Sequence, residues 1–360
     1  MSTSTHVTII AEAGVNHNGD LRRALAMVDA AAEAGADAVK FQTFRPEALV
    51  TAGAPQAEYQ RRNDGDRGSQ LAMLRRLALP EADHPALVRR CRARGIRFLS
   101  SPFDPASADF LMHDLGLEVI KLGSGELTNG PLIHRVARAG RRLILSTGMA
   151  TLDEIREALA VAALGYLGRP VPSGRAGRLA VMEEERATTA LEARVQLLHC
   201  TTEYPCPPEA VNLRAMETLA GAFGLPVGYS DHTEGITVAV AAAARGARII
   251  EKHFTLDRTL PGPDHAASLE PDQLRAMVEA VRIVERALGG RDKAPVAVER
   301  ENMAAARKSL VAACAIRAGE PFSESNLAVK RPGTGRSPMD YWSLLGRPAP
   351  RDYAADEVIQ

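Results

Sequence analysis

Short apolar runs alternate from Val7 to Leu288 with longer Ala- and Leu-rich stretches that have helical spacing. The short runs are rich in β-branched residues, as is typical of buried parallel strands. The pattern predicts eight strands, at 7–11, 38–42, 96–100, 118–122, 142–146, 195–199, 228–233 and 249–255.

A helical stretch follows each predicted strand. These stretches lie at 21–34, 69–77, 85–94, 106–115, 131–139, 152–164, 213–223, 236–245 and 271–288. Such a repeat of strand and helix is the pattern of an α/β fold of the (β/α)8 TIM-barrel type. A doubly wound open sheet is the alternative, but it would usually show a Gly-rich nucleotide-binding turn after its first strand, and that signature is absent.

Polar or charged side chains stand at the end of every predicted strand. In a closed parallel barrel the carboxyl ends of the strands meet on one face, where barrel enzymes carry out their chemistry. We therefore expect the active site on this face. The polar clusters include Glu12, Lys40, Gln42, Ser101, Lys121, Ser124, Glu126, Ser146, His232 and His253.

Two histidines, His232 and His253, end the last two predicted strands, each close to an acidic residue. For either histidine alone, an ordinary polar residue closing a strand is the better explanation. Two histidines on neighbouring strands can bind one divalent metal ion and leave coordination positions open for a substrate. The pair therefore favours a metal site.

Two lysines, Lys40 and Lys121, lie within apolar runs, where an unpaired ammonium group is costly to bury. A salt bridge to Glu12 or Glu126 would explain either lysine alone. The lysines are accompanied by serines and a Gly-rich turn, at Ser101, Ser124, Ser146 and 123–125. Together these groups favour a phosphate site. A metal beside it would suit the joining of a phosphorylated donor to a metal-polarised acceptor.

Composition narrows the class of protein. Lys plus Arg and Asp plus Glu both number 44, so no net charge attracts nucleic acid or an anionic membrane. The four cysteines lack CxxC spacing, which indicates reduced thiols in a cytoplasmic protein. No run approaches the ~20 apolar residues of a membrane span. No basic region precedes the first apolar run, so we expect no signal peptide.

Ten motifs resemble, in order, those of the bacterial sialic acid synthase family, which includes the N-acetylneuraminate and N,N'-diacetyllegionaminate synthases. They are IAEAGVNHNG at 10–19, VKFQTF at 39–44, SPFD at 101–104, KLGSGE at 121–126, LSTGM at 145–149, HCTTEYP at 199–205, YSDHT at 229–233, EKHFT at 251–255, GPDHAAS at 262–268 and KRPGTG at 330–335. The resemblance covers about residues 7 to 359. It implies that phosphoenolpyruvate condenses with an N-acetylmannosamine-type sugar, an N-acetylated hexosamine, to give a nine-carbon 2-keto acid and phosphate.

The resemblance also implies roles for the matching positions. The metal ligands would be His232 and His253, with Mn²⁺ or Mg²⁺ as the ion. The phosphoenolpyruvate contacts would be Lys40, Ser101, Lys121, Ser124, Ser146 and Ser230. The sugar contacts would be Gln42, Glu126, Tyr204, Asp264 and, from the other subunit of a domain-swapped homodimer, Arg331. Glu12 is the expected acid–base group, and Glu251 is the alternative.

Two regions depart from the barrel pattern. Residues 168–191 are longer than the family's usual connection, and their Pro/Gly-rich start and charged run predict a solvated loop with a short helix. Because this segment leads from a helix to a strand, we expect it at the opposite end of the barrel (1–288) from the chemistry. A linker at 289–301 then precedes a β-rich module at 302–360, which resembles the family's antifreeze-like SAF domain, a β-clip fold. Taken alone, that module could also be a packing or dimerisation unit.

Other functions remain alternatives. A different phosphoenolpyruvate-dependent aldol-type synthase would use another aldose, and a catalytically silent relative would only bind sugar. The polar strand ends favour an enzyme, because a silent relative need not keep the lysines, histidines and glutamates together. Two acceptors fit the motifs, N-acetylmannosamine and 2,4-diacetamido-2,4,6-trideoxymannose.

Overall fold

The computed structural model describes residues 6–64 and 68–360. Residues 1–5, on which most of the expectation about a signal peptide rests, lie outside the described residues, as do 65–67. The chain divides into two compact units, Met1–Gly289 and Gly290–Gln360. Among the helices of the described residues, none has the length and apolar character needed to cross a membrane.

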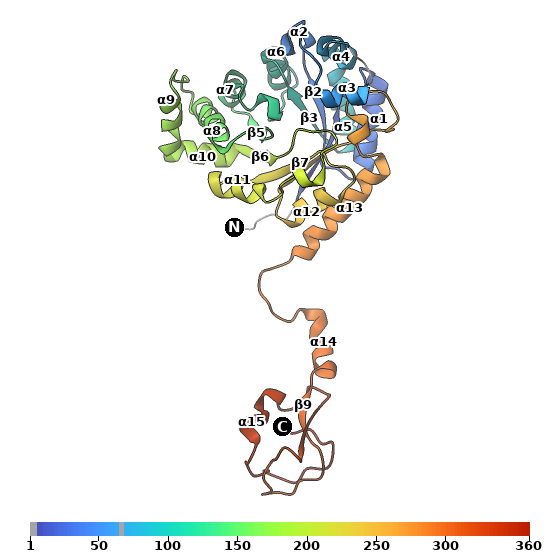
Figure 1. Cartoon of the computed structure of the whole chain (residues 1–360), viewed down its shortest axis with the longest axis vertical. Helices are drawn as coiled ribbons and strands as arrows, with labels where there is room; N and C mark the ends of the chain where they lie inside the picture. The colour runs from blue at the N-terminus through green and yellow to red at the C-terminus, as the bar shows by residue number, and fades with distance from the viewer. Residues whose placement is uncertain (1–5, 65–67) are drawn as a thin grey trace. The chain divides into compact units, whose positions relative to one another are not determined.

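The first unit is a barrel of parallel strands surrounded by helices (Figure 1). The strands are β1 (Thr8–Gly14), β2 (Ala38–Thr43), β3 (Arg97–Pro102), β4 (Val119–Leu122), β5 (Arg142–Ser146), β6 (Val195–His199), β7 (Val227–Asp231) and β8 (Ile249–His253). They lie in the order β3-β2-β1-β8-β7-β6-β5-β4, and β3 also contacts β4, so the sheet closes on itself. The predicted (β/α)8 fold is confirmed.

A helix follows each strand of the barrel. These helices are α1 (Leu21–Glu33), α5 (His84–Arg94), α6 (Pro105–Asp109) with a π-helical turn η2 (Phe110–Asp114), α7 (Gly130–Arg138), α8 (Leu152–Tyr166), α11 (Ala215–Phe223), α12 (Thr237–Ala244) and α13 (Pro271–Leu288). Side-chain caps fix where several of them begin. The Asp20 carboxylate accepts from two backbone N–H groups of the first turn of α1, and Thr151 forms a capping box with Glu154 at α8.

A layer of apolar side chains fills the barrel interior below its carboxyl-terminal face. It consists of Ile10, Ala38, Leu99, Ile144, Leu198 and Ile249. Because side chains alternate along a strand, the residue two positions later also points into the barrel, one layer nearer the carboxyl ends. Those later residues are Glu12, Lys40, Ser101, Ser146, Cys200 and Glu251. The strand period therefore places the polar groups directly above an apolar floor.

The long polar segment after β2 folds into helices of its own, α2 (Pro46–Leu49), α3 (Glu58–Asp64), α4 (Gln70–Leu77) and η1 (Glu81–Asp83). It carries a small apolar cluster separate from the barrel core, made of Val15, Phe44, Met73, Leu74 and Leu77. The Asn63 amide ties α3 to two loops of the barrel, since it donates to Tyr204 O (3.2 Å) and Pro263 O (2.8 Å).

The short helix expected within residues 168–191 is present, but the expectation for this segment is wrong in two other respects. The segment forms α9 (Arg175–Leu179), η4 (Ala180–Glu183) and α10 (Glu185–Arg194), with Val181 and Leu191 buried in the barrel core, so it is more than a solvated loop. Arg175 and Arg178 pair with Glu157 in the second turn of α8. Because α8 starts at the carboxyl ends of the strands, this pairing draws α9 back to the same end as the polar residues, not the opposite one.

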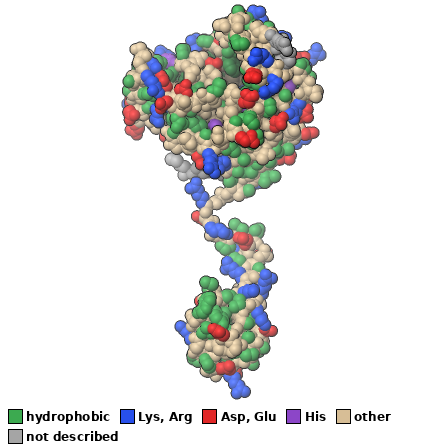
Figure 2. All heavy atoms as spheres, viewed as in Figure 1, with side chains coloured by type: hydrophobic (Ala, Val, Ile, Leu, Met, Phe, Trp, Pro, Cys, Tyr) green, Lys and Arg blue, Asp and Glu red, His purple; other side chains and the backbone are tan. Residues whose placement is uncertain are grey.

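The second unit contains α14 (Ala297–Ala306), the antiparallel strands β9 (Ser309–Ala312) and β10 (Leu327–Lys330), η7 (Pro338–Asp340) and α15 (Tyr341–Leu344). Helix α14 begins inside the stretch expected to be a linker. The unit has its own core, which includes Leu310, Phe322 and Tyr353. Hydrophobic side chains gather on its visible face (Figure 2), and Met339 and Trp342 are among the exposed large hydrophobic residues.

Candidate active site

A cavity of about 430 Å³ opens at the carboxyl ends of the barrel strands. It is lined by all the barrel residues to which the sequence analysis gave a site role: Glu12, Lys40, Gln42, Ser101, Lys121, Ser124, Glu126, Ser146, Tyr204, Ser230, His232, Glu251, His253 and Asp264. Arg331 belongs to the second unit, where its exposed side chain donates from Nε to Ala306 O (3.1 Å).

Two lysines and two glutamates form a buried charge cluster at the base of this cavity. Lys40 Nζ lies 2.8 Å from Glu12 Oε2 and 3.5 Å from Glu251 Oε2. Lys121 Nζ lies 3.2 Å from Glu251 Oε1, which also accepts a hydrogen bond from Ser230 Oγ (2.8 Å). Glu251 is thus shared between the two lysines.

The expected alternative partner of Lys121, Glu126, does not pair with it. Glu126 lies beyond β4, in the turn η3 (Ser124–Glu126), and its carboxylate accepts from Asn129 Nδ2 (2.6 Å). Lys121 lies within the strand and points across the barrel interior toward β8 instead. The salt bridge between Lys40 and Glu12 is present as expected.

The pKa values of the two glutamates in the cluster are shifted in opposite directions. Burial raises the pKa of Glu12 to about 7, against the lowering effect of Lys40. Burial also acts to raise the pKa of Glu251, but Lys121 and Lys40, with the hydrogen bond from Ser230, bring it well below its usual range. Glu12 can therefore exchange a proton near neutral pH while Glu251 stays ionised, a separation that suits acid–base chemistry.

Hydroxyl groups surround the lysines. Ser101 Oγ accepts from Lys40 Nζ (3.2 Å), and Ser124 Oγ accepts from Gly148 N (3.0 Å). The buried hydroxyl of Ser146 has no hydrogen-bond partner among the described residues. A buried polar group without a partner calls for an explanation, and a ligand oxygen in the cavity would supply one.

The two histidine rings meet edge to face in the cavity lining, with centroids 5.6 Å apart. His232 Nδ1 donates to Thr201 O (2.6 Å), so its Nε2 carries the free lone pair. Burial lowers the pKa of His232 to about 4 and that of His253 well below its usual value. Both rings are therefore neutral at pH 7, the form in which imidazole binds a metal.

The donor set at these histidines fits an open metal site. Within residues 6–64 and 68–360, no three His, Cys, Asp or Glu side chains are grouped as metal ligands. The carboxylate of Asp264 comes closest to joining the pair, with Oδ2 3.9 Å from His253 Nδ1. Two imidazole nitrogens would leave the remaining positions of an ion to water and substrate oxygens, as catalytic sites require.

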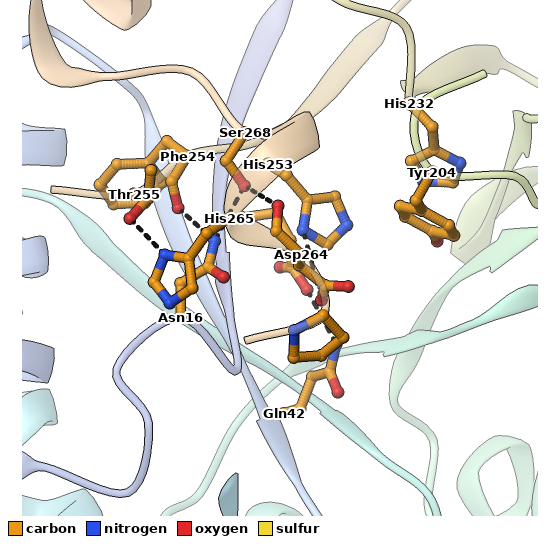
Figure 3. Close-up of polar contacts among 12 residues, drawn as sticks. Asn16, Gln42, Tyr204, His232, His253, Phe254, Thr255, Asp264, His265 and Ser268 are labelled. Carbon is orange, nitrogen blue, oxygen red and sulfur yellow. Dashed lines mark hydrogen bonds and ion pairs between the residues drawn. The ribbon is translucent and has the colours of Figure 1, made fainter. Parts of the chain in front are cut away.

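Two tyrosine rings line the cavity next to His232. The Tyr204 ring lies over the His232 ring, with centroids 4.1 Å apart (Figure 3), and Tyr59 of α3 stacks on Tyr204 at 4.9 Å. Sequence reasoning did not find Tyr59, because it lies in a segment without barrel periodicity.

Asn16 and Ser268, to which the sequence analysis gave no role, hold the backbone of Asp264 in place. Asn16 Nδ2 donates to Phe254 O (2.8 Å) and Ser268 Oγ (2.9 Å), and Ser268 Oγ donates to Asp264 O (2.6 Å; Figure 3). Burial raises the pKa of Asp264 to about 6. Asn16 stands in the motif at 10–19, so its place just after β1 was a usable signal.

A buried ion pair fastens the two histidine strands to each other behind the cavity. Lys252 Nζ lies 2.8 Å from Asp231 Oδ2, and both side chains are fully buried. Asp231 also accepts from Tyr229 OH (3.2 Å) and from Thr233 N (2.9 Å). Strand alternation would have indicated this pair. Lys252 stands between Glu251 and His253, which point into the barrel, so its own side chain points out of the barrel and needs a partner there.

The comparisons with known proteins agree with this geometry. The sequence pattern of the NeuB family matches residues 27–293, and that of the SAF domain matches residues 307–360. The chain belongs to the NeuB family. It is 45% identical to an N,N'-diacetyllegionaminic acid synthase of Campylobacter jejuni, over 98% of both chains. A protein of the same name from Legionella pneumophila is 43% identical, over 94% of this chain and 89% of that one.

A solved structure supports the same assignment. The N-acetylneuraminic acid synthetase of Leptospira borgpetersenii, in complex with citrate, is 32% identical and superposes with a TM-score of 0.66, covering 82% of this chain and 90% of that one. The predicted family resemblance is confirmed.

Proposed function

We propose that this NeuB-family chain is a nonulosonic acid synthase, which condenses phosphoenolpyruvate with an N-acetylated mannosamine-type sugar and releases phosphate. One observation carries the proposal. Two buried lysines, two carboxylates of different acidity and a pair of neutral histidines line one cavity. The names of the relatives support the same reaction class.

The lysine cluster is the proposed phosphoenolpyruvate site. A bound phosphate or carboxylate would bring negative charge to Lys40 and Lys121, which otherwise share Glu251. The hydroxyls of Ser101, Ser124 and Ser146 would donate to its oxygens, and Ser146 would gain the partner that it lacks.

The histidine pair is the proposed site of Mn²⁺ or Mg²⁺. His232 Nε2 and a ring nitrogen of His253 would be the protein ligands, and Thr201 O fixes the tautomer of His232. When bound, the ion would polarise the aldehyde oxygen of the open-chain sugar. Gln42, Glu126, Tyr204 and Asp264 line the same cavity and would hold the sugar beside the ion.

Glu12 is the proposed acid–base group. As C3 of phosphoenolpyruvate bonds to the aldehyde carbon, positive charge develops at C2 and a water molecule adds there before phosphate leaves. Glu12 would take the proton from that water, because its pKa of about 7 lets it hold or release a proton at neutral pH. Glu251 remains ionised and would position both lysines.

The proposed acceptor is 2,4-diacetamido-2,4,6-trideoxymannose rather than N-acetylmannosamine, because the relatives that are 45% and 43% identical are named N,N'-diacetyllegionaminic acid synthases. Phosphate release in the presence of Mn²⁺, phosphoenolpyruvate and each sugar tests the function. We expect release with the diacetamido sugar at a higher kcat/KM. No release with either sugar would refute the proposed nonulosonic acid synthase.

We further propose a homodimer in which the SAF domains are exchanged, so that Arg331 reaches the sugar in the partner's barrel. Arg331 is exposed in its own unit, and the exposed Met339 and Trp342 offer apolar surface for a partner. Refolding His232→Ala together with Arg331→Ala tests this. Random pairing should recover about a quarter of wild-type activity, since half of the dimers would hold one complete site. No recovery would mean that the domains are not exchanged.

We also propose that the protein works in the cytoplasm. All four cysteines, Cys91, Cys200, Cys206 and Cys314, are free thiols in the structure. Free thiols persist in reducing compartments.

A further inference from the structure

The outer wall of the active-site cavity is apolar. Leu49, Val50, Met73, Leu74 and Leu77 line the same cavity as the charge cluster and the histidines. All five come from the segment after β2, and none of them contributes a charged or metal-binding group. We define these residues as the outer wall.

Helix α4 and a small apolar cluster hold the outer wall in place. Gln70, Met73, Leu74 and Leu77 are spaced by three, one and three residues, so they lie on one face of α4. Ser69 fixes the start of this helix, because its side chain accepts from Ala72 N (3.2 Å). Met73, Leu74 and Leu77 pack on Val15 and Phe44 in a closed apolar cluster.

The position of the outer wall follows from the strands beneath it. Val15, Phe44 and Phe103, which pack in its cluster, follow β1, β2 and β3 respectively. The histidines stand at β7 and β8. A sugar that places its aldehyde at the histidines must direct its far carbons away from them, and the outer wall is an apolar surface within the same cavity.

Two amide-bearing side chains stand beside the outer wall. Gln60 and Gln70 both line the cavity, and the Gln60 side-chain oxygen is already used by Ala57 N (2.9 Å). Gln70 lies on the same face of α4 as the apolar residues. It can both donate to and accept from another amide.

We infer that the outer wall with Gln70 is the subsite that selects the acceptor, a proposal that rests on the synthase function proposed above. The wall receives the C6 methyl group of a 6-deoxy sugar, and Gln70 pairs with the 4-acetamido group. A C6 hydroxyl would face the apolar side chains without a hydrogen-bond partner, which disfavours N-acetylmannosamine.

Three acceptors separate the contribution of the outer wall from that of Gln70: N-acetylmannosamine, 2-acetamido-2,6-dideoxymannose and the 2,4-diacetamido-2,4,6-trideoxy sugar. Leu49→Ala should lower kcat/KM for both 6-deoxy sugars about tenfold or more, since lost methylene contacts are worth roughly 10- to 200-fold in such pockets. It should lower kcat/KM for N-acetylmannosamine by less, because a C6 hydroxyl gains little from contact with leucine. Gln70→Met, which keeps the length and removes the amide, should affect only the sugar with the 4-acetamido group. The Michaelis constant for phosphoenolpyruvate should stay the same in both variants.

Val50→Thr is the conservative check, because it replaces one methyl group of this half-buried side chain with a hydroxyl of similar size. It should move the preference toward N-acetylmannosamine. Val171→Ala, a partly exposed apolar residue that does not line the active-site cavity, is the matched control and should change nothing.

An equal effect of Leu49→Ala, Gln70→Met and Val50→Thr on all three sugars would overturn the assignment of the subsite. That result differs from failure of the synthase function itself, in which the wild type would release no phosphate with any of the three sugars.

Discussion

Replacing Lys121 with methionine removes one positive charge from the cavity and keeps nearly the same volume. In the structure Lys121 Nζ pairs with Glu251 Oε1 at 3.2 Å, with both side chains buried. If Lys121 also binds phosphoenolpyruvate, the variant loses a charge-assisted contact worth about 1.5–3 kcal/mol. We therefore expect the Michaelis constant for phosphoenolpyruvate to rise about 10- to 150-fold, at about 1.4 kcal/mol per tenfold.

The same substitution should lower stability only moderately. Breaking a buried ion pair costs about 3–5 kcal/mol when the remaining charge has no other partner. Glu251 keeps Lys40 at 3.5 Å and the hydrogen bond from Ser230 at 2.8 Å. We therefore expect the free energy of unfolding to fall by less than about 3 kcal/mol.

Lys252→Met is the matched control. Lys252 is also buried in an ion pair, 2.8 Å from Asp231 Oδ2, but it does not line the cavity. It should lower stability at least as much as Lys121→Met without changing the ratio of the two Michaelis constants. Initial rates with each substrate varied, and denaturant unfolding of both variants, give the comparison. Equal rises of the phosphoenolpyruvate and sugar constants in Lys121→Met would refute the reasoning.

Two further predictions concern the metal and acid stability. His232→Ala should abolish activity and the Mn²⁺-dependent rise in melting temperature while the fold remains, and a wild type that turns over normally after complete metal removal would contradict this. His17 is buried, and burial lowers its pKa from 6.5 to about 4, so its contribution to stability is complete above pH 6.5 and is lost as the pH falls toward 4. The loss is about 3 kcal/mol at 1.36 kcal/mol per unit, and His17→Asn should flatten the pH dependence of the unfolding free energy in this range.

Much of the site follows from strand period. The alternation that places Ile10 in the apolar layer also places Glu12 above it, and the same rule holds for Ile249 and Glu251. Sequence reasoning therefore found the charged and hydroxyl side chains that the strands bring to the cavity, without the distances between them. Their partners were harder to predict. Lys121 of β4 pairs with Glu251 of β8 because the barrel brings the two strands to opposite sides of one interior. A single sequence does not show which side chains meet across that interior.

The segments without period were predicted least well. Residues 168–191 have a polar, Pro/Gly-rich start, which suggested a solvated loop, but Arg175 and Arg178 draw the chain back along α8 by pairing with Glu157. Pairing of this kind depends on the position of α8, which local composition does not encode. Tyr59 and Asn63 escaped notice for the same reason, since their contacts lie more than a hundred residues away along the chain.

The chemistry-bearing side chains and the outer wall are distributed differently along the chain. The former come from the barrel strands and from the loops that follow them, so they are spread over most of the first unit. The outer wall comes from one continuous stretch, from Leu49 to Leu77, held on the barrel by its own small core and by Asn63. The sequence of such a continuous stretch can change, or be exchanged between relatives, without changes in the barrel strands. Acceptor preference could thus change during evolution while the condensation machinery stayed intact.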